Sequence, residues 1–161
     1  MSQPQFVDTN IFLRYLTQDP QRYKACLALF KQAERNEVHL VTSEAIIAEI
    51  VFVLSSPKHY KHSRQQIQLA LSRLLLLPGL TVPNRNLYLR ALASYTKSGL
   101  DFEDCLTIAY MEQANIRQLY SYDRGFDQVD GVERTEPALS EEALVSEQRQ
   151  QADDPEVHND E

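Results

Sequence analysis

The sequence contains few cysteines and few glycines, and both shortages exclude classes of protein. Its two cysteines, Cys26 and Cys105, lie far apart within apolar patterns, so we expect two buried free thiols rather than a disulfide framework. The chain has no CxxC spacing, which argues against a structural zinc site. Only four of the 161 residues are glycine, and this composition excludes a collagen-like chain.

A long hydrophobic run is also missing. The longest apolar stretch covers residues 45–54 and is interrupted by Glu49, whereas a membrane-spanning helix needs roughly 20 apolar residues. The opening residues contain neither a basic region nor a hydrophobic stretch, so we expect no secretory signal. Together with the free thiols, these features predict a cytoplasmic protein.

Acidic charge is concentrated at one end of the chain. The 16 Lys and Arg and the 23 Asp and Glu give a net charge of −7, which taken alone argues against binding to a polyanion. Residues 136–161 hold nine of the acids and one base, whereas residues 1–135 hold 14 acids and 15 bases. We therefore expect one domain over residues 1–136 and an acidic, disordered tail over residues 137–161.

Strands and helices are predicted to alternate along the domain. Short apolar runs indicate strands near residues 6–7, 38–42, 80–82, 118–122 and 132–135. Apolar residues at helical spacing indicate helices near residues 9–16, 23–33, 44–54, 63–75, 87–95 and 101–113. This alternation predicts an α/β fold with a mostly parallel sheet.

Several acidic side chains lie where parallel α/β folds bind ligands. Asp8 and Asp123 each follow a predicted strand, and ligands bind beyond the carboxyl ends of strands in open parallel sheets. At the start of a predicted helix, Asp101 suits an N-cap, whereas Asp104 suits either the helix dipole or a site. Glu49 lies in a helix that is apolar nearly all round, so we expect it to be buried and either paired or bound to a metal.

A cluster of carboxylates without His or Cys partners selects a hard cation such as Mg²⁺ or Mn²⁺. Such clusters support hydrolysis of phosphodiester bonds. Glu44 is left out of the cluster, because its place in the first turn of a helix favours an interaction with the helix dipole. Scattered acids are common in proteins, so the residue types alone leave both a metal site and its absence open.

Four short blocks of sequence resemble PIN-domain ribonucleases, specifically toxins of the VapC type. The blocks are Phe6-Val7-Asp8-Thr9-Asn10, Ser43-Glu44-Ala45-Ile46-Ile47-Ala48-Glu49, Asp101-Phe102-Glu103-Asp104-Cys105 and Ser121-Tyr122-Asp123. They occur in the family's order over roughly residues 5–135. The chain departs from the pattern at Cys105, where alanine is more usual, and at Ser121-Tyr122, where Thr-Phe is more usual.

The resemblance implies a three-layer α/β/α domain and an Mg²⁺- or Mn²⁺-dependent endoribonuclease that hydrolyses RNA with a metal-activated water. By position, the acidic quartet of the family matches Asp8, Glu49, Asp104 and Asp123. Asp8 and Asp104 would be the main direct metal ligands. Glu49 and Asp123 would complete the site, through water or a second metal.

The resemblance also implies supporting roles for neighbours of the quartet. Thr9 and Ser121 would orient carboxylates through their hydroxyl groups, and Asn10 would hydrogen-bond within the site. Asp127 is a candidate accessory acid, although a surface carboxylate that stabilises a turn is the simpler interpretation.

Basic side chains near the site are candidates for holding the RNA backbone. They are Arg14, Lys58, Lys61, Arg64 and Arg124. The run from Lys58 to His62 combines cations with an aromatic ring that could stack on a base, and it equally suits a solvated loop between two helices.

The resemblance further implies a homodimer and a cognate antitoxin that covers the active-site groove. Tyr15 and Tyr23 suit either such an interface or the core. Two other functions remain open, namely a housekeeping RNA-processing nuclease and a PIN-like binding module with weak or no catalysis. A phosphatase with an aspartyl nucleophile is disfavoured, because it would need an Asp where Asn10 stands.

Overall fold

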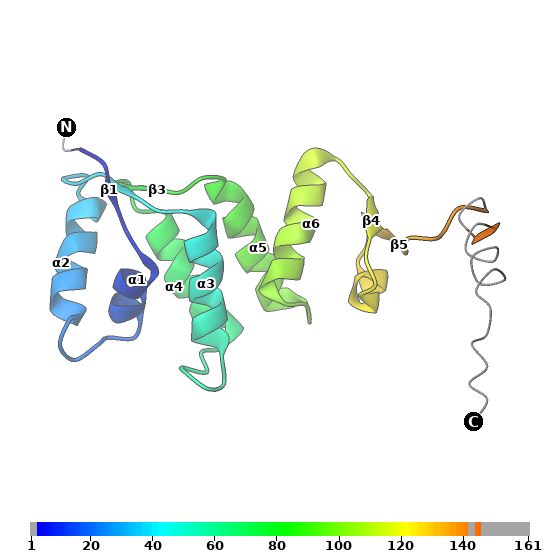
Figure 1. Ribbon diagram of the computed structural model, residues 1–161. Coiled ribbons are helices and arrows are strands. Elements are labelled where there is room, and N and C mark those ends of the chain that lie inside the picture. Colours follow the sequence, from blue (N-terminus) through cyan, green and yellow to red (C-terminus); the bar gives the residue numbers. More distant parts are fainter. Residues whose placement is uncertain (1–2, 142–143, 146–161) are drawn as a thin grey trace, which may run out of the picture. The chain divides into compact units, whose positions relative to one another are not determined.

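The computed structural model describes residues 3–141 and 144–145. The chain divides into two compact units, Met1–Ile116 and Arg117–Glu161, and each is described by itself. Figure 1 shows the order of the elements along the chain. Within the described residues, no helix is long and apolar enough to cross a membrane.

Three short parallel strands form the sheet of the first unit. The strands are β1 (Gln5–Phe6), β2 (Leu40–Val41) and β3 (Leu80–Thr81), with β2 in the centre. Phe6 pairs with Val41, and Val41 pairs with Thr81. Because all three strands run in the same direction, their carboxyl ends meet at one edge of the sheet, which is the edge where Asp8 follows β1.

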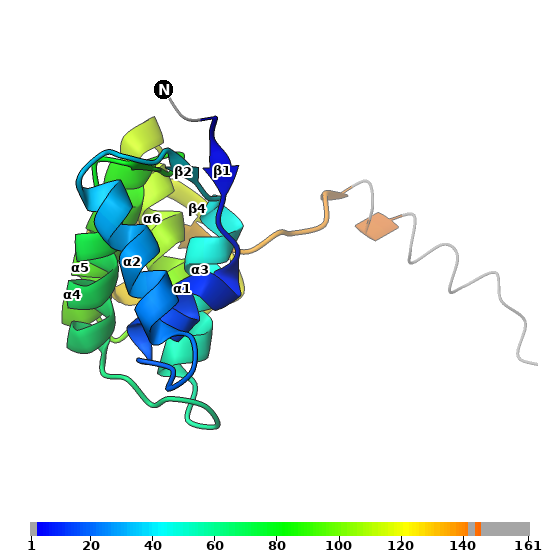
Figure 2. The ribbon, with the colours of Figure 1, turned by 90° about the vertical axis from the view of Figure 1, so that its left-hand side faces the viewer.

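Six helices surround this sheet. They are α1 (Thr9–Leu16), α2 (Tyr23–Glu34), α3 (Glu44–Ser55), α4 (Arg64–Leu75), α5 (Arg85–Lys97) and α6 (Phe102–Ala114). Helix α3 contacts α1, α4 and α6, and Figure 2 shows α1 and α2 together at one end of this unit. The core is formed by fully buried side chains from nearly all of these elements, such as Phe12, Leu40, Ile50 and Leu92.

Local sequence signals explain where several elements begin. The Ser63 hydroxyl accepts a hydrogen bond from the Gln66 N–H at 3.2 Å, and the Gln66 side chain accepts one from the Ser63 N–H at 2.8 Å. This reciprocal capping box starts α4 at the predicted place. Ser43 caps α3 by accepting from the Ile46 N–H. Directly before β3, position 79 requires glycine, because an added Cβ would lie only 2.5 Å from the Val38 carbonyl oxygen.

Residues 117–136 of the second unit form two parallel strands and a short 3₁₀ helix. Strand β4 (Gln118–Tyr120) pairs with β5 (Glu133–Thr135), and the 3₁₀ helix η1 (Arg124–Gln128) lies between them in sequence. Arg134 on β5 forms ion pairs with Asp127 at 2.7 Å and with Glu136 at 2.8 Å. Asp127 therefore pairs with a residue on β5, and its roles as a turn-stabilising surface carboxylate or an accessory acid stay predictions.

The predicted α/β class and its parallel strands are confirmed, and the strands divide into one sheet per unit. Cys26 and Cys105 are buried and free, as expected. The domain boundary at residue 136 stays a prediction. Of the predicted disordered tail, only residues 137–141 and 144–145 are described, and the remainder lies outside the described residues.

Candidate active site

The end of β1 and the middle of α3 are joined by a hydrogen bond between side chains. The Thr9 hydroxyl donates to Oε2 of Glu49 at 2.7 Å. Thr9 is buried and begins α1 directly after Asp8, which stands at the N-cap position of that helix. This bond therefore holds the Glu49 carboxylate beside the carboxyl end of β1, where the sequence predicts the site.

Asp8 is exposed and takes part in a local contact with Asn10. The Asn10 amide donates to Oδ2 of Asp8 at 3.3 Å, so Asn10 hydrogen-bonds to an acid of the predicted quartet. Although Asp8 occupies the N-cap position, its side chain makes no capping hydrogen bond. Its second carboxylate oxygen is therefore available to a ligand.

The prediction that Glu49 is buried is wrong. Its side chain is exposed, and so are Ala45 and Phe52, which lie four residues before it and three residues after it on the same helix. The Phe52 side chain is 66% exposed, although Ile47, Ile50 and Leu54 on the same helix are fully buried. An apolar stripe alone decides which side of α3 faces the core, and the remaining apolar residues are left at the surface.

Asp104 lies in the first turn of α6 and is partly buried. Because α3 contacts both α1 and α6, the elements that carry Asp8, Glu49 and Asp104 are neighbours within the first unit. Asp101 stands at the predicted N-cap of α6, but its carboxylate makes no capping hydrogen bond. The Asp101 carboxylate is therefore available for contacts other than a helix cap.

Asp123 and Ser121 belong to the second unit and shape its sharp turn. Oδ1 of Asp123 accepts a hydrogen bond from the Gly125 N–H at 2.7 Å, at the N-cap of η1. The Ser121 hydroxyl accepts from the Asp123 N–H at 3.0 Å and thereby fixes the backbone that carries this acid. The predicted strand-to-turn position of Asp123 is confirmed, and its role in a site stays a prediction.

The described residues do not form a complete metal site. Within residues 3–141 and 144–145, no group of three or more His, Cys, Asp or Glu side chains lies close enough to hold a metal ion. The donor chemistry at Asp8 and Glu49 is purely carboxylate oxygen, which suits Mg²⁺ or Mn²⁺. The ligand atoms thus suit a hard cation, but the described side chains are not arranged as a complete coordination shell.

The candidate RNA-binding cations differ in their exposure and in whether they already form ion pairs. Lys58 and Lys61 are exposed in the loop between α3 and α4, and Arg124 is exposed at the start of η1. Arg14 forms an ion pair with Asp19 at 3.0 Å, so part of its guanidinium is occupied. In the loop, the Tyr60 ring lies 6.1 Å from the His62 ring and is 39% exposed, which leaves a face for stacking.

Arg64 has a structural role that the sequence did not reveal. Its Nη1 donates to the carbonyl oxygens of Tyr95, Ser98 and Leu100 at 2.9, 3.2 and 2.5 Å. Its guanidinium carbon also lies 4.2 Å from the centre of the Tyr95 ring. Arg64 therefore ties the start of α4 to the end of α5, and its assignment as an RNA contact is not supported by these contacts.

Glu44 also does more than the sequence suggested. The Tyr110 hydroxyl donates to Glu44 at 3.1 Å, and the Asn84 amide donates to it at 2.5 Å. Partial desolvation and then the hydrogen bond to Glu44 raise the pKa of Tyr110. This cluster connects α3, α5 and α6, and no spacing in the sequence identifies it because its members are far apart along the chain.

The chain was compared with known proteins. Its sequence matches the PIN domain family over residues 6–132. No curated protein matches. One similar solved structure is VapC20 of Mycobacterium tuberculosis, which is described as a toxin that cleaves the sarcin–ricin loop. The two chains are 18% identical with a TM-score of 0.35, and the match covers 78% of this chain and 93% of that chain. Because the family match extends over most of the sequence, the chain belongs to the PIN domain family.

Proposed function

We propose that this protein is an endoribonuclease that depends on a divalent metal ion and acts as the toxin of a toxin–antitoxin pair. Membership of the PIN domain family supports a nuclease activity. The observation that supports the proposal is the 2.7 Å hydrogen bond to Glu49 from Thr9, the residue that follows Asp8 after β1. PIN-domain nucleases generally use divalent metal ions, and the carboxylate donors present here suit Mg²⁺ or Mn²⁺.

In the proposed reaction, water attacks the scissile phosphorus of RNA. A bond forms between the water oxygen and phosphorus while the bond to the 3′ oxygen breaks, and the water proton ends on that leaving oxygen. The products carry 5′-phosphate and 3′-hydroxyl ends. We assign the acidic roles to Asp8, Glu49, Asp104 and Asp123. The route does not use the 2′-hydroxyl of RNA and needs no pair of histidines.

The test is cleavage of a panel of structured RNAs by the full chain with Mg²⁺, Mn²⁺ or EDTA. We expect cleavage only with metal, and a loss of at least about 100-fold in Asp8→Asn and Asp104→Asn, because removing a direct ligand costs more than disturbing its support. Asp130→Asn is the matched control, since Asp130 is an exposed acid outside the proposed quartet. Equal cleavage by parent and quartet variants would disprove the site assignment.

The partner proposal rests on an apolar groove on the first unit. A cavity of about 620 Å³ lies between α1, α2 and α4, and Tyr15, Tyr23 and Phe30 line it. Tyr15 and Tyr23 stack with ring centres 5.9 Å apart, and burial raises the pKa of Tyr15. We propose that an apolar segment of a cognate antitoxin docks here, in a groove whose lining includes two cations, Lys31 and Arg73, and one acid, Glu34.

A short adjacent reading frame that encodes a small DNA-binding protein would supply this antitoxin. Its product should co-purify with the full chain and suppress cleavage, and substitution of Tyr23 by Asp should abolish both effects. A homodimer is also proposed, and light scattering on the full chain measures it. Without such a neighbouring gene, a housekeeping RNA-processing nuclease becomes the better assignment.

A catalytically weak binding module is the second candidate. It would use the apolar groove lined by Tyr15, Tyr23 and Phe30 to bind a protein partner, without cleaving RNA. Tight binding of a protein partner, with no cleavage of any RNA in the panel under any metal, would support this candidate over the nuclease.

A further inference from the structure

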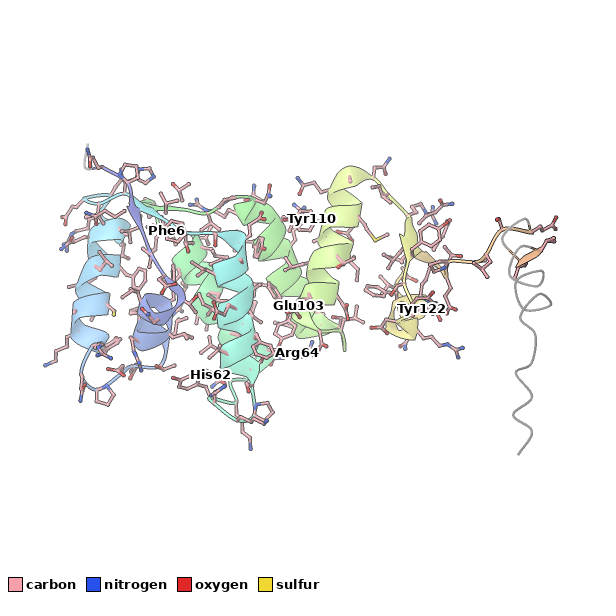
Figure 3. All side chains as sticks on the ribbon, in the orientation of Figure 1. Phe6, His62, Arg64, Glu103, Tyr110 and Tyr122 are labelled. Carbon is pink, nitrogen blue, oxygen red and sulfur yellow. The ribbon has the colours of Figure 1, made fainter. Side chains whose placement is uncertain are left out.

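A small cavity opens beside the proposed site, between the second half of α3 and the start of α6. Its volume is about 300 Å³, which is at the lower end for ligand pockets in proteins. Phe52, Ser56 and Pro57 line one side, and Asp101, Phe102 and Glu103 line the other. Figure 3 labels Glu103 on this side of α6, with His62 and Arg64 near the C-terminal end of α3.

The apolar part of the cavity is built to hold a flat ring. Phe102 is 4% exposed and forms the inner wall together with Tyr95, whose ring centre lies 5.8 Å from that of Phe102. Phe52 is 66% exposed at the rim. Phe52 lies one helical turn after Glu49, so a ring stacked on Phe52 would belong to a nucleotide close to the proposed site of cleavage.

The polar part of the cavity is dominated by two carboxylates, and Ser55 and Ser56 also line it. The carboxylates of Asp101 and Glu103 both line it and make no hydrogen bond or ion pair within the part of the chain that the structure describes. Free carboxylates accept hydrogen bonds from the amino groups of bases, as Asp and Glu do from cytosine N4. Uracil has a single donor on this edge, its ring N3–H, between the O4 and O2 acceptors that these anions repel, so it is bound less favourably than a base with an amino group.

The neighbouring loop supplies charge of the opposite sign. It follows Pro57 directly and carries the exposed side chains of Lys58 and Lys61 together with the Tyr60 ring. Cations at this place can hold the phosphates on either side of an extruded base, which offsets the cost of bringing a polyanion near two carboxylates. The cavity thus combines a stacking face, base-edge acceptors and phosphate contacts.

We propose that this cavity binds one unpaired, amino-bearing base of the RNA substrate, cytosine or adenine or guanine, in preference to uracil. The base stacks on Phe52, and its amino group donates to Asp101 or Glu103. This proposal rests on the proposed nuclease function and names the base selectivity of the same site. Asp101 and Glu103 are specificity residues here and take no part in bond breaking.

The test measures binding and cleavage separately. The full-length Asp8→Asn protein is titrated with fluorescent eight-residue oligonucleotides of cytidine or uridine, and Kd is read by anisotropy. We expect the cytidine oligomer to bind at least about fivefold more tightly. In Asp101→Asn/Glu103→Gln this ratio should fall below about twofold, because amides both donate and accept. Phe52→Ala should weaken the cytidine oligomer by roughly fivefold or more and the uridine oligomer by less, because uracil is held less often against this ring.

Matched controls are Glu112→Gln, an exposed acid on α6 outside the cavity, and Leu69→Ala, an exposed apolar residue on α4. Both should leave the ratio unchanged, and thermal melting checks that all variants fold. Equal affinity of the parent for the two oligomers, or discrimination that survives the double variant, would overturn the proposal. Dissociation of a dimer by Phe52→Ala with no effect on RNA would do the same and would identify a protein interface.

Cleavage of the same oligonucleotides by the parent with Mg²⁺ or Mn²⁺ is scored independently. Base discrimination without cleavage would keep the cavity assignment and reject the nuclease function. Metal-dependent cleavage without base discrimination would keep the nuclease function and reject the cavity assignment.

Discussion

Thr9 is the residue that connects the end of β1 to α3. It is one of two buried polar residues among those described, and its hydroxyl donates to Glu49 at 2.7 Å. The second, Thr42, donates to the Val7 carbonyl at 3.0 Å and so tightens the same edge of the sheet. Buried hydroxyls that hold a strand end and a carboxylate in place make the geometry of this edge reproducible.

Replacing Thr9 by Val tests this role. The variant keeps the side-chain shape but removes the donor to Glu49, so we expect RNA cleavage to fall about 10- to 100-fold, as for other groups that orient a ligand. The free energy of unfolding should fall by only about 1 kcal/mol. Thr9→Ser retains the hydroxyl and should keep most of the activity. Cleavage assays and urea denaturation measure the two effects, and full activity in Thr9→Val would contradict the role.

The ionised carboxylate of Asp19 is stabilised by contacts made in the folded protein. Its Oδ1 accepts hydrogen bonds from the backbone N–H groups of Arg22 at 2.8 Å and Gln21 at 3.1 Å, and its Oδ2 pairs with Arg14. The backbone hydrogen bond from Arg22 is the largest cause that lowers the pKa of this carboxyl below its ordinary 3.8. The ionised form is therefore favoured by folding.

The contribution of Asp19 to the free energy of unfolding therefore depends on pH. A lowered pKa contributes stability that is fully present above the unfolded value near 3.8 and is lost as the pH falls through the lower folded value. We expect Asp19→Asn to unfold more easily than the parent at about pH 6 and the difference to shrink below about pH 4. Urea denaturation from pH 2 to 6 measures it. A difference that stays constant over this range would refute the assignment.

Among the elements, α3 shows how far a hydrophobic pattern determines orientation. Its composition predicts burial on all sides, because Glu49 is its only charged residue after Glu44. In the structure only Ile47, Ile50, Val51 and Leu54 are buried, and the opposite face is exposed. A helix on the surface of a single sheet layer can bury one stripe only, and the pattern does not say which apolar residues lie outside it.

Helix ends were easier to predict than helix faces. Ser63 with Gln66 and Ser43 before α3 act through hydrogen bonds within four residues, so the sequence shows them directly. Asp101 also stands at the N-cap of its helix, but its side chain makes no capping hydrogen bond. A single N-cap residue is therefore a weaker signal than the reciprocal box of Ser63 and Gln66.

Arg64 links α4 to α5, and its replacement should destabilise the protein. In Arg64→Met the carbonyls of Ser98 and Leu100 lose a charged donor, and the expected loss is about 2 kcal/mol in the free energy of unfolding. Arg90→Met is the control, because Arg90 is exposed on α5. Urea denaturation measures both variants, and equal stability of the two would refute the link.

The same variant separates structural cations from RNA-binding cations. Folded Arg64→Met should bind RNA as tightly as the parent. Lys58→Ala/Lys61→Ala should bind RNA more weakly, and the slope of log K against log[salt] should fall by the amount expected for the loss of about two phosphate contacts. A salt titration of RNA affinity distinguishes the two groups. The prediction fails if Arg64→Met reduces the salt slope as the lysine variant does.

At the scale of the whole molecule, the uneven charge is the dominant feature. The acids of residues 137–161 give this segment its negative charge, whereas residues 1–136 are nearly neutral. If the proposed quartet binds cations, the remaining charge of the domain is positive, which suits a polyanionic substrate. The acidic segment then competes with RNA for the same basic surface or serves solubility.

Deletion of residues 137–161 decides between these roles. Competition predicts that the deletion tightens RNA binding at low salt by about tenfold or more and that the gain disappears at high salt, where charges are screened. Kd at several salt concentrations, for the deletion and for the full chain, measures this effect. Unchanged affinity at low salt would leave only the solubility role.

The sequence by itself determined the alternation of strands and helices, most of their ends, the two buried thiols and the positions of the candidate acids. These properties depend on local hydrogen bonds and on periodic burial, which act over a few residues. Only the tertiary structure decided that Glu49 meets Thr9 and faces solvent, that Arg64 holds α5, and that Asp101 and Glu103 line a cavity with Phe52. These contacts join residues far apart in the chain, and their geometry is set by how the helices pack on the sheet.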